Sequence, residues 1–324
     1  MTALARCLAC CAAFVLAALA PARSQSAYPD KPVHVILPYG AGGVADVTTR
    51  LVAQKLSERM GQNFVIDNRP GAGGIAAAKA VMSSPADGYT LFLTGNGMAI
   101  NQSLFKTPPY NAVADFTPVA LLAEFEMLLV TKADSQFAKL ADLVAYAKAN
   151  PGKLNFGAIN VGSTQNLSAE LFRMVSGAQV TLVTYRTTPD LVTAVMRGDV
   201  DLAFDYLAAL RPSIAGKQIK VLATSGAHDD PQLPGVPTAR DSGYPDYLVT
   251  SWNGLSGPAG MPTEIATKLN GEIEIVLKLP EVKERMAALG MEPMLGTPQQ
   301  LNERMKQDIE KWRVVIEKAG IPTQ

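Results

Sequence analysis

Histidine and cysteine, the side chains most used for metal binding and nucleophilic catalysis, are scarce in this chain of 324 residues. Only two histidines occur, His34 and His228, and they are far apart in the sequence. The three cysteines are Cys7, Cys10 and Cys11, all close to the N-terminus. The sequence therefore predicts no metal site, no cofactor and no histidine-dependent triad, and we expect a protein that is not an enzyme.

Net charge is also lacking, since 29 Lys and Arg residues balance 29 Asp and Glu residues. Without a basic field, binding to nucleic acid or to an anionic membrane surface is not expected. Hydrophobic residues make up 48% of the chain, which at this length is enough for the cores of two globular units.

The first 22 residues have the pattern of a secretory signal peptide. Arg6 precedes an apolar run from Leu8 to Ala20, and Ala20-Pro21-Ala22 provides a small-residue cleavage site. We expect cleavage after Ala22, or as late as Ser26, and a mature periplasmic protein without cysteine. No later stretch approaches the apolar length of a membrane-spanning helix.

Strand and helix patterns alternate after this segment. The β-branched run Val33–Leu37 ends at Pro38, a glycine-rich loop follows, and an apolar stripe predicts a helix over residues 45–60. Strands are predicted at 64–66 and 89–94, with a helix opening at a second GAGG sequence at 71–74. This order predicts an α/β fold with a parallel sheet.

Two long extended passages, residues 116–131 and 247–255, suit segments that cross between two units. Strands and helices alternate again over residues 140–224, and the C-terminal remainder is predicted to be helical. We therefore predict domain I at residues 27–122 plus 250–324 and domain II at 123–249. The ligand cleft is expected between them.

The loop after the first strand has the character of an anion site. Free N–H groups and the positive end of the dipole at a helix start favour a negative group. Gly40–Ala45 also matches the dinucleotide pattern G-x-G-x-x-A, with Asp67 at the end of the next strand, so an NAD-dependent oxidoreductase is an alternative. Because Pro38-Tyr39 separates the strand from the first glycine, and because the pattern recurs at 71–76, we favour a small anion. The predicted contacts are Tyr39, Ala41, Gly42 and Gly43.

Further candidate contacts follow later strands. Gly162, Ser163, Thr164 and Gln165 form a polar loop that serves either as a second anion cradle or as an N-cap by Ser163 or Thr164. Tyr185 is either a ligand contact or a half-buried strand tyrosine. Asp205, expected just after a strand at 200–204, would hold a ligand ammonium or hydroxyl group, or cap a helix. Asn96, after the third strand, is the remaining candidate.

Two other residues have plainer explanations. Asp46 and Arg50, four apart near a helix start, are expected to form a surface ion pair. Trp252, on the second extended passage, is expected to pack in the hinge rather than line the ligand site.

Segments along the whole mature chain resemble one known family. They are LPYGAGGVADVTTR at 37–50, VIDNRPGAGG at 65–74, SPADGYTLFL at 84–93, DFTPVALLA at 115–123, LPGVPTARDSGYPD at 233–246, SWNGLSGPAGMP at 251–262, and W-x-x-V-I-x-x-A-G-I near the C-terminus. In this order they resemble the tripartite tricarboxylate transporter substrate-binding proteins, also called the Bug or TctC family.

The resemblance implies a two-lobe periplasmic-binding-protein fold of the type II-like kind, whose two domains are joined by two crossing segments. Family ligands are small organic carboxylates: di- and tricarboxylates, acidic amino acids and aromatic acids. A membrane permease of the tripartite class is the expected partner, and a monomer is expected. The resemblance also implies that Tyr39–Gly43 binds one ligand carboxylate, with Gly162–Gln165 and Asp205 contributed by the second lobe.

Three departures from the family's pattern leave the ligand open. The family's usual histidine in the second-lobe loop is Asn166, its Pro-Tyr-Lys-Gly segment reads Thr184-Tyr185-Arg186-Thr187, and its usual arginine after residues 219–224 gives way to Ala227-His228-Asp229. The hypothesis is thus an extracytoplasmic solute-binding protein that serves a permease. A binding protein that presents its closed form to a signalling partner is a second alternative.

Overall fold

The computed structural model of the chain describes residues 28–70, 74–159 and 162–323. The predicted signal peptide and the first three residues of the second GAGG sequence lie outside the described residues. Within the described ranges, none of the helices combines the length and the apolar character needed to cross a membrane. From Lys31 onward, the described residues form one compact unit.

The first group of strands is parallel and alternates with helices, as the sequence predicts. β1 (Val33–Leu37) pairs with β2 (Phe64–Asn68) on one side and with β3 (Thr90–Gly95) on the other. The helices that follow these strands in turn are α2 (Val44–Met60), α3 (Ile75–Met82) and α4 (Asn96–Leu104). Gly61 ends α2 in the left-handed conformation (φ 73°), which glycine adopts without strain.

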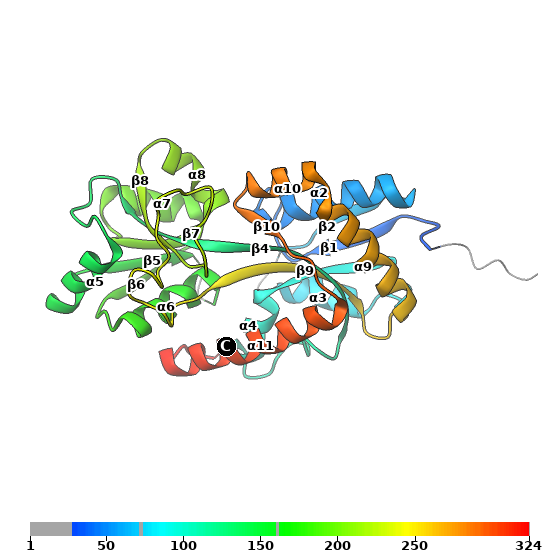
Figure 1. Cartoon of the computed structure of the whole chain (residues 1–324). Coiled ribbons are helices and arrows are strands. Elements are labelled where there is room, and N and C mark those ends of the chain that lie inside the picture. Colours follow the sequence, from blue (N-terminus) through cyan, green and yellow to red (C-terminus); the bar gives the residue numbers. More distant parts are fainter. Residues whose placement is uncertain (1–27, 71–73, 160–161, 324) are drawn as a thin grey trace, which may run out of the picture. The chain divides into compact units, whose positions relative to one another are not determined.

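Two long strands make the sheet mixed rather than purely parallel. β4 (Phe116–Lys132) and β9 (Thr250–Pro258) run antiparallel to each other, and β9 is also antiparallel to β3. β4 pairs with β9 up to Glu126, and from Met127 onward it pairs with β7 and β8. Figure 1 shows the two strands side by side at the centre of the sheet. The predicted extended passages are therefore sheet strands, while the division into domains I and II stays a prediction.

The second group of strands repeats the alternation. β5 (Asn155–Ile159) lies between β6 (Thr181–Tyr185) and β7 (Leu202–Tyr206), and all three are parallel. α5 (Leu140–Ala149) precedes β5, and the helices that follow the strands are α6 (Thr164–Ser176), α7 (Thr188–Arg197) and α8 (Leu207–Ala215). β8 (Ile219–Thr224) pairs antiparallel with β4. The order across the sheet is β2-β1-β3-β9-β4-β7-β5-β6, with β8 and β10 both paired to β4.

The C-terminal region is mainly helical, as predicted, with α9 (Thr263–Lys278), α10 (Pro280–Ala287) and α11 (Pro298–Ala319). Two elements were not predicted. β10 (Met291–Pro293) pairs with β4 but is too short to show a period, and α8 contains Pro212, which as a sequence signal argues against a helix. One hydrophobic cluster includes Phe92 of β3, Trp252 of β9 and Phe156 of β5, so both groups of strands share a core.

Candidate functional site

The parallel strands bring the starts of several helices to the same sheet edges. β1 and β3 both end where α2 and α4 begin, because parallel neighbours have their carboxyl ends at one edge. β5, β6 and β7 do the same for α6, α7 and α8. A helix start carries backbone N–H groups without helical partners, so each edge concentrates hydrogen-bond donors and positive potential.

The loop between β1 and α2 is exposed and contains the predicted contacts Ala41, Gly42 and Gly43. Gly42 has φ 85°, a conformation that favours glycine. Gly43 is the N-cap of α2, and no side chain caps this helix. The Gly42 N–H donates to Asp46 Oδ2 at 2.9 Å, so one donor of the loop is already engaged by a carboxylate of the same helix.

Asp46 holds this loop in shape, a role the sequence did not reveal. Its carboxylate accepts hydrogen bonds from Arg50 Nε and Asn68 Nδ2, both at 2.9 Å, and Asn68 also donates to the carbonyl of Tyr39. Burial acts to raise the pKa of Asp46, but the hydrogen bonds from Arg50, Gly42 and Asn68 outweigh it and hold that pKa below its ordinary value. The expected ion pair with Arg50 is confirmed, yet the expectation of a surface site was wrong for Asp46, which is 3% exposed.

Tyr39 points its hydroxyl inward, although the residue as a whole is 40% exposed. A side-chain carbon added at Gly97 would lie 3.5 Å from the Tyr39 hydroxyl, so this hydroxyl reaches the start of α4. Burial raises the pKa of the Tyr39 hydroxyl, which keeps it a neutral donor. The structure thus places a neutral hydroxyl between the starts of α2 and α4.

The predicted loop Gly162–Gln165 opens α6. Ser163 is the N-cap: its hydroxyl accepts from the Asn166 N–H at 3.1 Å and donates to the carbonyl of Ile159. The Gly162 N–H donates to Asn166 Oδ1 at 3.0 Å. The N-cap interpretation of Ser163 is therefore confirmed, and the side chain of Asn166, where the family's histidine usually stands, is part of the loop's own hydrogen bonding.

This loop lies against the first group of elements. A side-chain carbon at Gly162 would fall 2.5 Å from Leu104 Cδ2 at the end of α4, and the φ of 79° also favours glycine at this close approach. The helix start of α6 and the elements around α4 are therefore neighbours within the unit.

Asp205 lies within β7 rather than after it, and it is 1% exposed. It accepts hydrogen bonds from Gln165 Nε2 at 3.1 Å, from the Tyr206 N–H at 2.8 Å and from the Thr188 hydroxyl. Burial raises the pKa of Asp205 against the effect of these hydrogen bonds. Gln165 and Asp205, both predicted contacts, are thus bonded to each other.

Tyr206 is a site residue that the sequence did not single out. Its hydroxyl lies 2.7 Å from Ser251 Oγ on β9, and Thr164 also hydrogen-bonds it. Burial raises the pKa of Tyr206; the hydrogen bond with Ser251 acts against this rise, and the charge of Asp205 adds to it. Ser251 precedes Trp252, whose N–H donates to Asn96 at the start of α4, so the Tyr206 hydroxyl connects to the sheet edge that the Tyr39 hydroxyl also reaches. The sequence feature that could have identified Tyr206 is its position directly after Asp205, at the end of a strand.

Asn96 is brought into a buried structural network instead of an open site. Its Oδ1 accepts from the Trp252 N–H and its Nδ2 donates to Asp308 Oδ2, both at 3.0 Å. Trp252 Nε1 donates to the same Asp308 oxygen at 2.6 Å, so the packing role expected for Trp252 is confirmed. A ligand contact by Asn96 would require one of these hydrogen bonds to be given up.

Tyr185 is half-buried, in line with the strand-tyrosine interpretation. It packs on a hydrophobic cluster that includes Leu191, Val195 and Leu210. Burial, followed by the charge of Asp199, raises the pKa of Tyr185.

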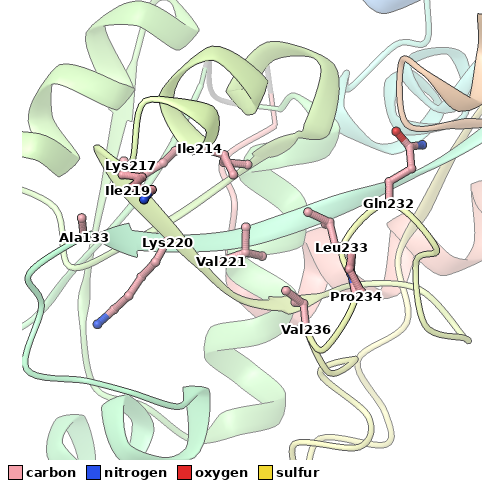
Figure 2. A pocket seen from close by; sticks show the side chains of 10 residues that line it. All are labelled: Ala133, Ile214, Lys217, Ile219, Lys220, Val221, Gln232, Leu233, Pro234 and Val236. Carbon is pink, nitrogen blue, oxygen red and sulfur yellow. The ribbon is translucent and has the colours of Figure 1, made fainter.

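A hollow of about 390 Å³ lies elsewhere, along β8 (Figure 2). Most of its walls are apolar and come from β8, α8 and the loop before residue 237. The lining residues are Ala133, Ile214, Lys217, Ile219, Lys220, Val221, Gln232, Leu233, Pro234 and Val236. None of the predicted ligand contacts borders this hollow.

The described residues provide few ligands for a metal ion and few contacts for a dinucleotide. Among them, no group of three or more His, Cys, Asp and Glu side chains is placed to hold a metal ion. Asp67, the acid of the dinucleotide pattern, accepts two hydrogen bonds from Arg69, at 2.9 and 2.7 Å. The Asp46 carboxylate lies against the glycine loop, where a pyrophosphate would need to approach.

Comparison with known proteins agrees with these observations. The family model described as tripartite tricarboxylate transporter family receptor matches residues 48–321. The solved structure of R. palustris Rpa4515 with adipate is 35% identical, covers 90% of this chain and 98% of its own, and has a TM-score of 0.81. MatC (Rpa3494) from Rhodopseudomonas palustris with bound malate is 30% identical, with coverages of 89% and 100% and a TM-score of 0.77. Periplasmic binding protein BugD is 28% identical, with coverages of 92% and 100% and a TM-score of 0.79.

The resemblance seen in the sequence and the predicted class of fold are both confirmed. The mixed α/β fold is that of periplasmic solute-binding proteins of this type. The chain belongs to the tripartite tricarboxylate transporter receptor family, which includes the Bug and TctC proteins.

Proposed function

We propose that the protein captures a small organic carboxylate in the periplasm and passes it to a membrane permease of the tripartite tricarboxylate class. The family consists of substrate receptors rather than enzymes, and its solved members include a periplasmic binding protein. Two solved relatives contain adipate and malate, which are dicarboxylates. A ligand with two carboxylates would suit a site with helix starts on two sides.

One observation supports the proposal: the Tyr206 hydroxyl bonds Ser251, the neighbour of Trp252, and the Trp252 N–H in turn bonds Asn96 at the start of α4, so donors of the two sheet edges are linked. The Tyr39 hydroxyl stands at the edge of α2 and α4, and the Tyr206 hydroxyl stands at the edge of α6 and α8. Hydrogen bonds from helix starts and hydroxyl groups to a carboxylate are charge-assisted, so they are stronger than neutral ones. The charge of the ligand would thus be held without an arginine or lysine side chain.

The proposed contacts are the loop Tyr39–Gly43 on one side and Gly162, Ser163, Thr164, Gln165 and Tyr206 on the other. Ser163 takes part through its backbone, because its hydroxyl is engaged within the loop. Two lobes, the proposed domains I and II, would close over the ligand by bending β4 and β9 where their pairing changes at Glu126.

The rival functions receive less support. An NAD-dependent oxidoreductase would need the glycine loop and Asp67, and these are occupied by Asp46 and Arg69. A binding protein that serves a sensor would use the same ligand site, and no observation on the described residues favours it.

The test is titration of the mature protein by calorimetry with adipate, malate, citrate, aspartate, benzoate and NAD. We expect saturable binding of at least one carboxylate, and no binding of NAD. Tyr206→Phe should weaken carboxylate binding about tenfold, because a hydrogen bond to a charged group contributes about 1.5–3 kcal/mol. Tyr146→Phe is the matched control, because Tyr146 lies on α5 with its ring edge-to-face against Phe137, and it should bind as the wild type does.

Two outcomes would contradict the proposal. One is the absence of binding to every carboxylate, and the other is tight binding of NAD alone. Delivery to a permease is tested separately, by uptake of the bound carboxylate in membrane vesicles that contain the tripartite permease. Uptake that does not depend on the added binding protein would argue against that partner.

A further inference from the structure

We propose that Asp205 is a positioning residue, whose buried carboxylate holds the starts of α6, α7 and α8 in fixed relation to one another. The inference rests on the proposed function, since these helix starts form one half of the proposed carboxylate site. Of the two roles that the sequence left open for Asp205, a ligand contact and a helix cap, it sets aside the first and extends the second to three helices.

The hydrogen bonds to Asp205 come from three different helix starts. Gln165 is the second residue of α6, Thr188 is the first residue of α7, and Tyr206 is the N-cap of α8. Oδ1 accepts from Gln165 Nε2 at 3.1 Å and from the Tyr206 N–H at 2.8 Å, while Oδ2 accepts from the Thr188 hydroxyl. One rigid strand residue therefore receives one donor from each helix.

The burial of Asp205 argues against direct contact with a ligand. The residue is 1% exposed, and both of its oxygens already accept hydrogen bonds. An ammonium group of a ligand would have to displace Thr188 or Gln165 to reach it. A group that is enclosed in this way influences binding by fixing its neighbours, as supporting hydrogen bonds do around other binding sites.

The position of these three starts decides the affinity of the proposed site. Their N–H groups must point to one place for a carboxylate to accept several hydrogen bonds at once. Ser163 and Thr187 cap α6 and α7 locally, but each cap acts only within its own helix. Asp205 is the group among the described residues that bonds all three helix starts.

Asparagine and alanine at this position give opposite results if the role is positioning. In Asp205→Asn the amide oxygen can still accept from Gln165 and from the Tyr206 N–H, while the new NH2 group faces Thr188, whose hydroxyl can turn and accept. All three connections survive without the charge. In Asp205→Ala all three are lost.

Hydrogen–deuterium exchange of the mature protein without ligand tests the positioning directly. Asp205→Ala should speed exchange about tenfold in peptides spanning residues 164–168, 188–192 and 207–211 together, because lost hydrogen bonds permit local opening. Asp205→Asn should exchange like the wild type. Thr188→Val keeps Asp205 in place and should speed exchange at the start of α7 alone. This variant still tests the proposal if Asp205→Ala fails to fold. Unchanged exchange at the three starts in the folded Asp205→Ala variant would overturn the proposal.

Calorimetric titration with adipate and malate then tests the consequence for binding. We expect Asp205→Ala to weaken whichever of the two binds by about tenfold or more and Asp205→Asn to restore it, since one lost hydrogen bond to a charge is worth about that much. Asp201→Ala is the matched control at the opposite end of β7, where Asp201 accepts from the Asn155 N–H, and it should bind normally. Equal weakening by Asp205→Asn and Asp205→Ala, with normal exchange in Asp205→Asn, would mean that the charge contacts the ligand. If the wild type binds neither adipate nor malate, the variants are titrated with whichever of citrate, aspartate and benzoate it binds. Failure to bind any of these carboxylates would count against the proposed function and leave the exchange result to decide the role of Asp205.

Discussion

Replacing Glu126 by glutamine should stabilise the protein at alkaline pH. Glu126 is the last residue of β4 to pair with β9, and Met127 is the first to pair with β7. The Oε2 atom of Glu126 is buried and has no hydrogen bond of normal geometry. The Oγ1 atom of Thr224 faces this carboxyl group and offsets part of the effect of burial on its pKa, although Oγ1 also has no hydrogen bond of normal geometry. Burial, together with the charges of three nearby acids, raises the pKa of Glu126 to about 7. The three acids are Asp230, Glu292 and Glu124.

The size and sign of the effect follow from this pKa. A pKa raised from 4.5 to about 7 means that the folded state binds the proton more tightly than the unfolded chain does. The charged form therefore costs stability: nothing below about pH 4.5, progressively more up to pH 7, and a constant amount above it. The full difference corresponds to roughly 3 kcal/mol, and partial access of water to the half-buried carboxyl group reduces it to about 1–2 kcal/mol. Glutamine resembles the protonated form and avoids this cost.

Thermal unfolding followed by circular dichroism at pH 5 and pH 8 measures the difference. We expect the melting temperature of Glu126→Gln to exceed that of the wild type by about 3–6 °C at pH 8 and by little at pH 5. Glu170→Gln is the matched control, because Glu170 pairs with Arg173 at 2.8 Å on α6 and is not one of the acids that act on Glu126. It should give no gain at pH 8. An equal shift of Glu126→Gln at both pH values would refute the reasoning.

Gly226→Ala examines the same carboxyl group from the other side. A carbon at this position would lie 1.5 Å from Glu126 Oε1, so alanine must push the side chain outward. At pH 8 this movement returns the charged carboxylate of Glu126 to water, which offsets part of the cost. At pH 5 the carboxyl group is neutral and well accommodated where it is, so moving it brings no such gain. The destabilisation by Gly226→Ala should therefore be smaller at pH 8, and a cost independent of pH would contradict it.

Substitutions at three further positions test the loops and the core. Asp46→Ala should cost about 1–3 kcal/mol in urea unfolding at pH 7, because Arg50, Asn68 and the Gly42 N–H lose their acceptor. Since the pKa of Asp46 is lowered in the folded state, its contribution is present above its unfolded pKa and is lost as pH falls through the folded one, so wild type and variant should converge in acid. Ser163→Ala should cost about 1 kcal/mol by removing the N-cap of α6, and Ser163→Asp should restore most of it. Asp308→Ala should cost about 2–4 kcal/mol because Trp252 and Asn96 lose a shared buried acceptor, and an unchanged urea midpoint would contradict this.

Local sequence signals were sufficient for most of the fold. The apolar runs and glycine stops of β1, α2 and β2 lie where the pattern placed them, because propensity, capping and burial agree there. The mixed direction of the sheet could not be predicted in this way. Whether β9 runs parallel or antiparallel to β3 depends on long-range pairing, which leaves no period in the sequence. α8 was missed because Pro212 contradicts the tertiary context that keeps this segment helical.

The candidate site was predicted less evenly. The positions of the glycine loops follow from strand ends and helix starts, so Tyr39–Gly43 and Gly162–Gln165 could be selected from sequence alone. The hydrogen-bond partners of each side chain could not be predicted from the sequence. Asn96 is occupied by Trp252 and Asp308, which are 156 and 212 residues away in the chain. Tyr206 enters the site through Ser251, a residue of a different strand.

The two sheet edges share one further property, a buried carboxylate, that bears on how a ligand would be bound. Each edge contains its own buried carboxylate bonded to helix-start donors: Asp46 beside the β1–α2 loop and Asp205 among α6, α7 and α8. Each of these charges offsets part of the positive potential that the helix starts supply. A ligand carboxylate would therefore find hydrogen-bond donors that are fixed in direction. The electrostatic potential around it would be only moderately positive. That combination favours selection by hydrogen-bond geometry over strong electrostatic capture, which suits a receptor that has to release its ligand as well as bind it.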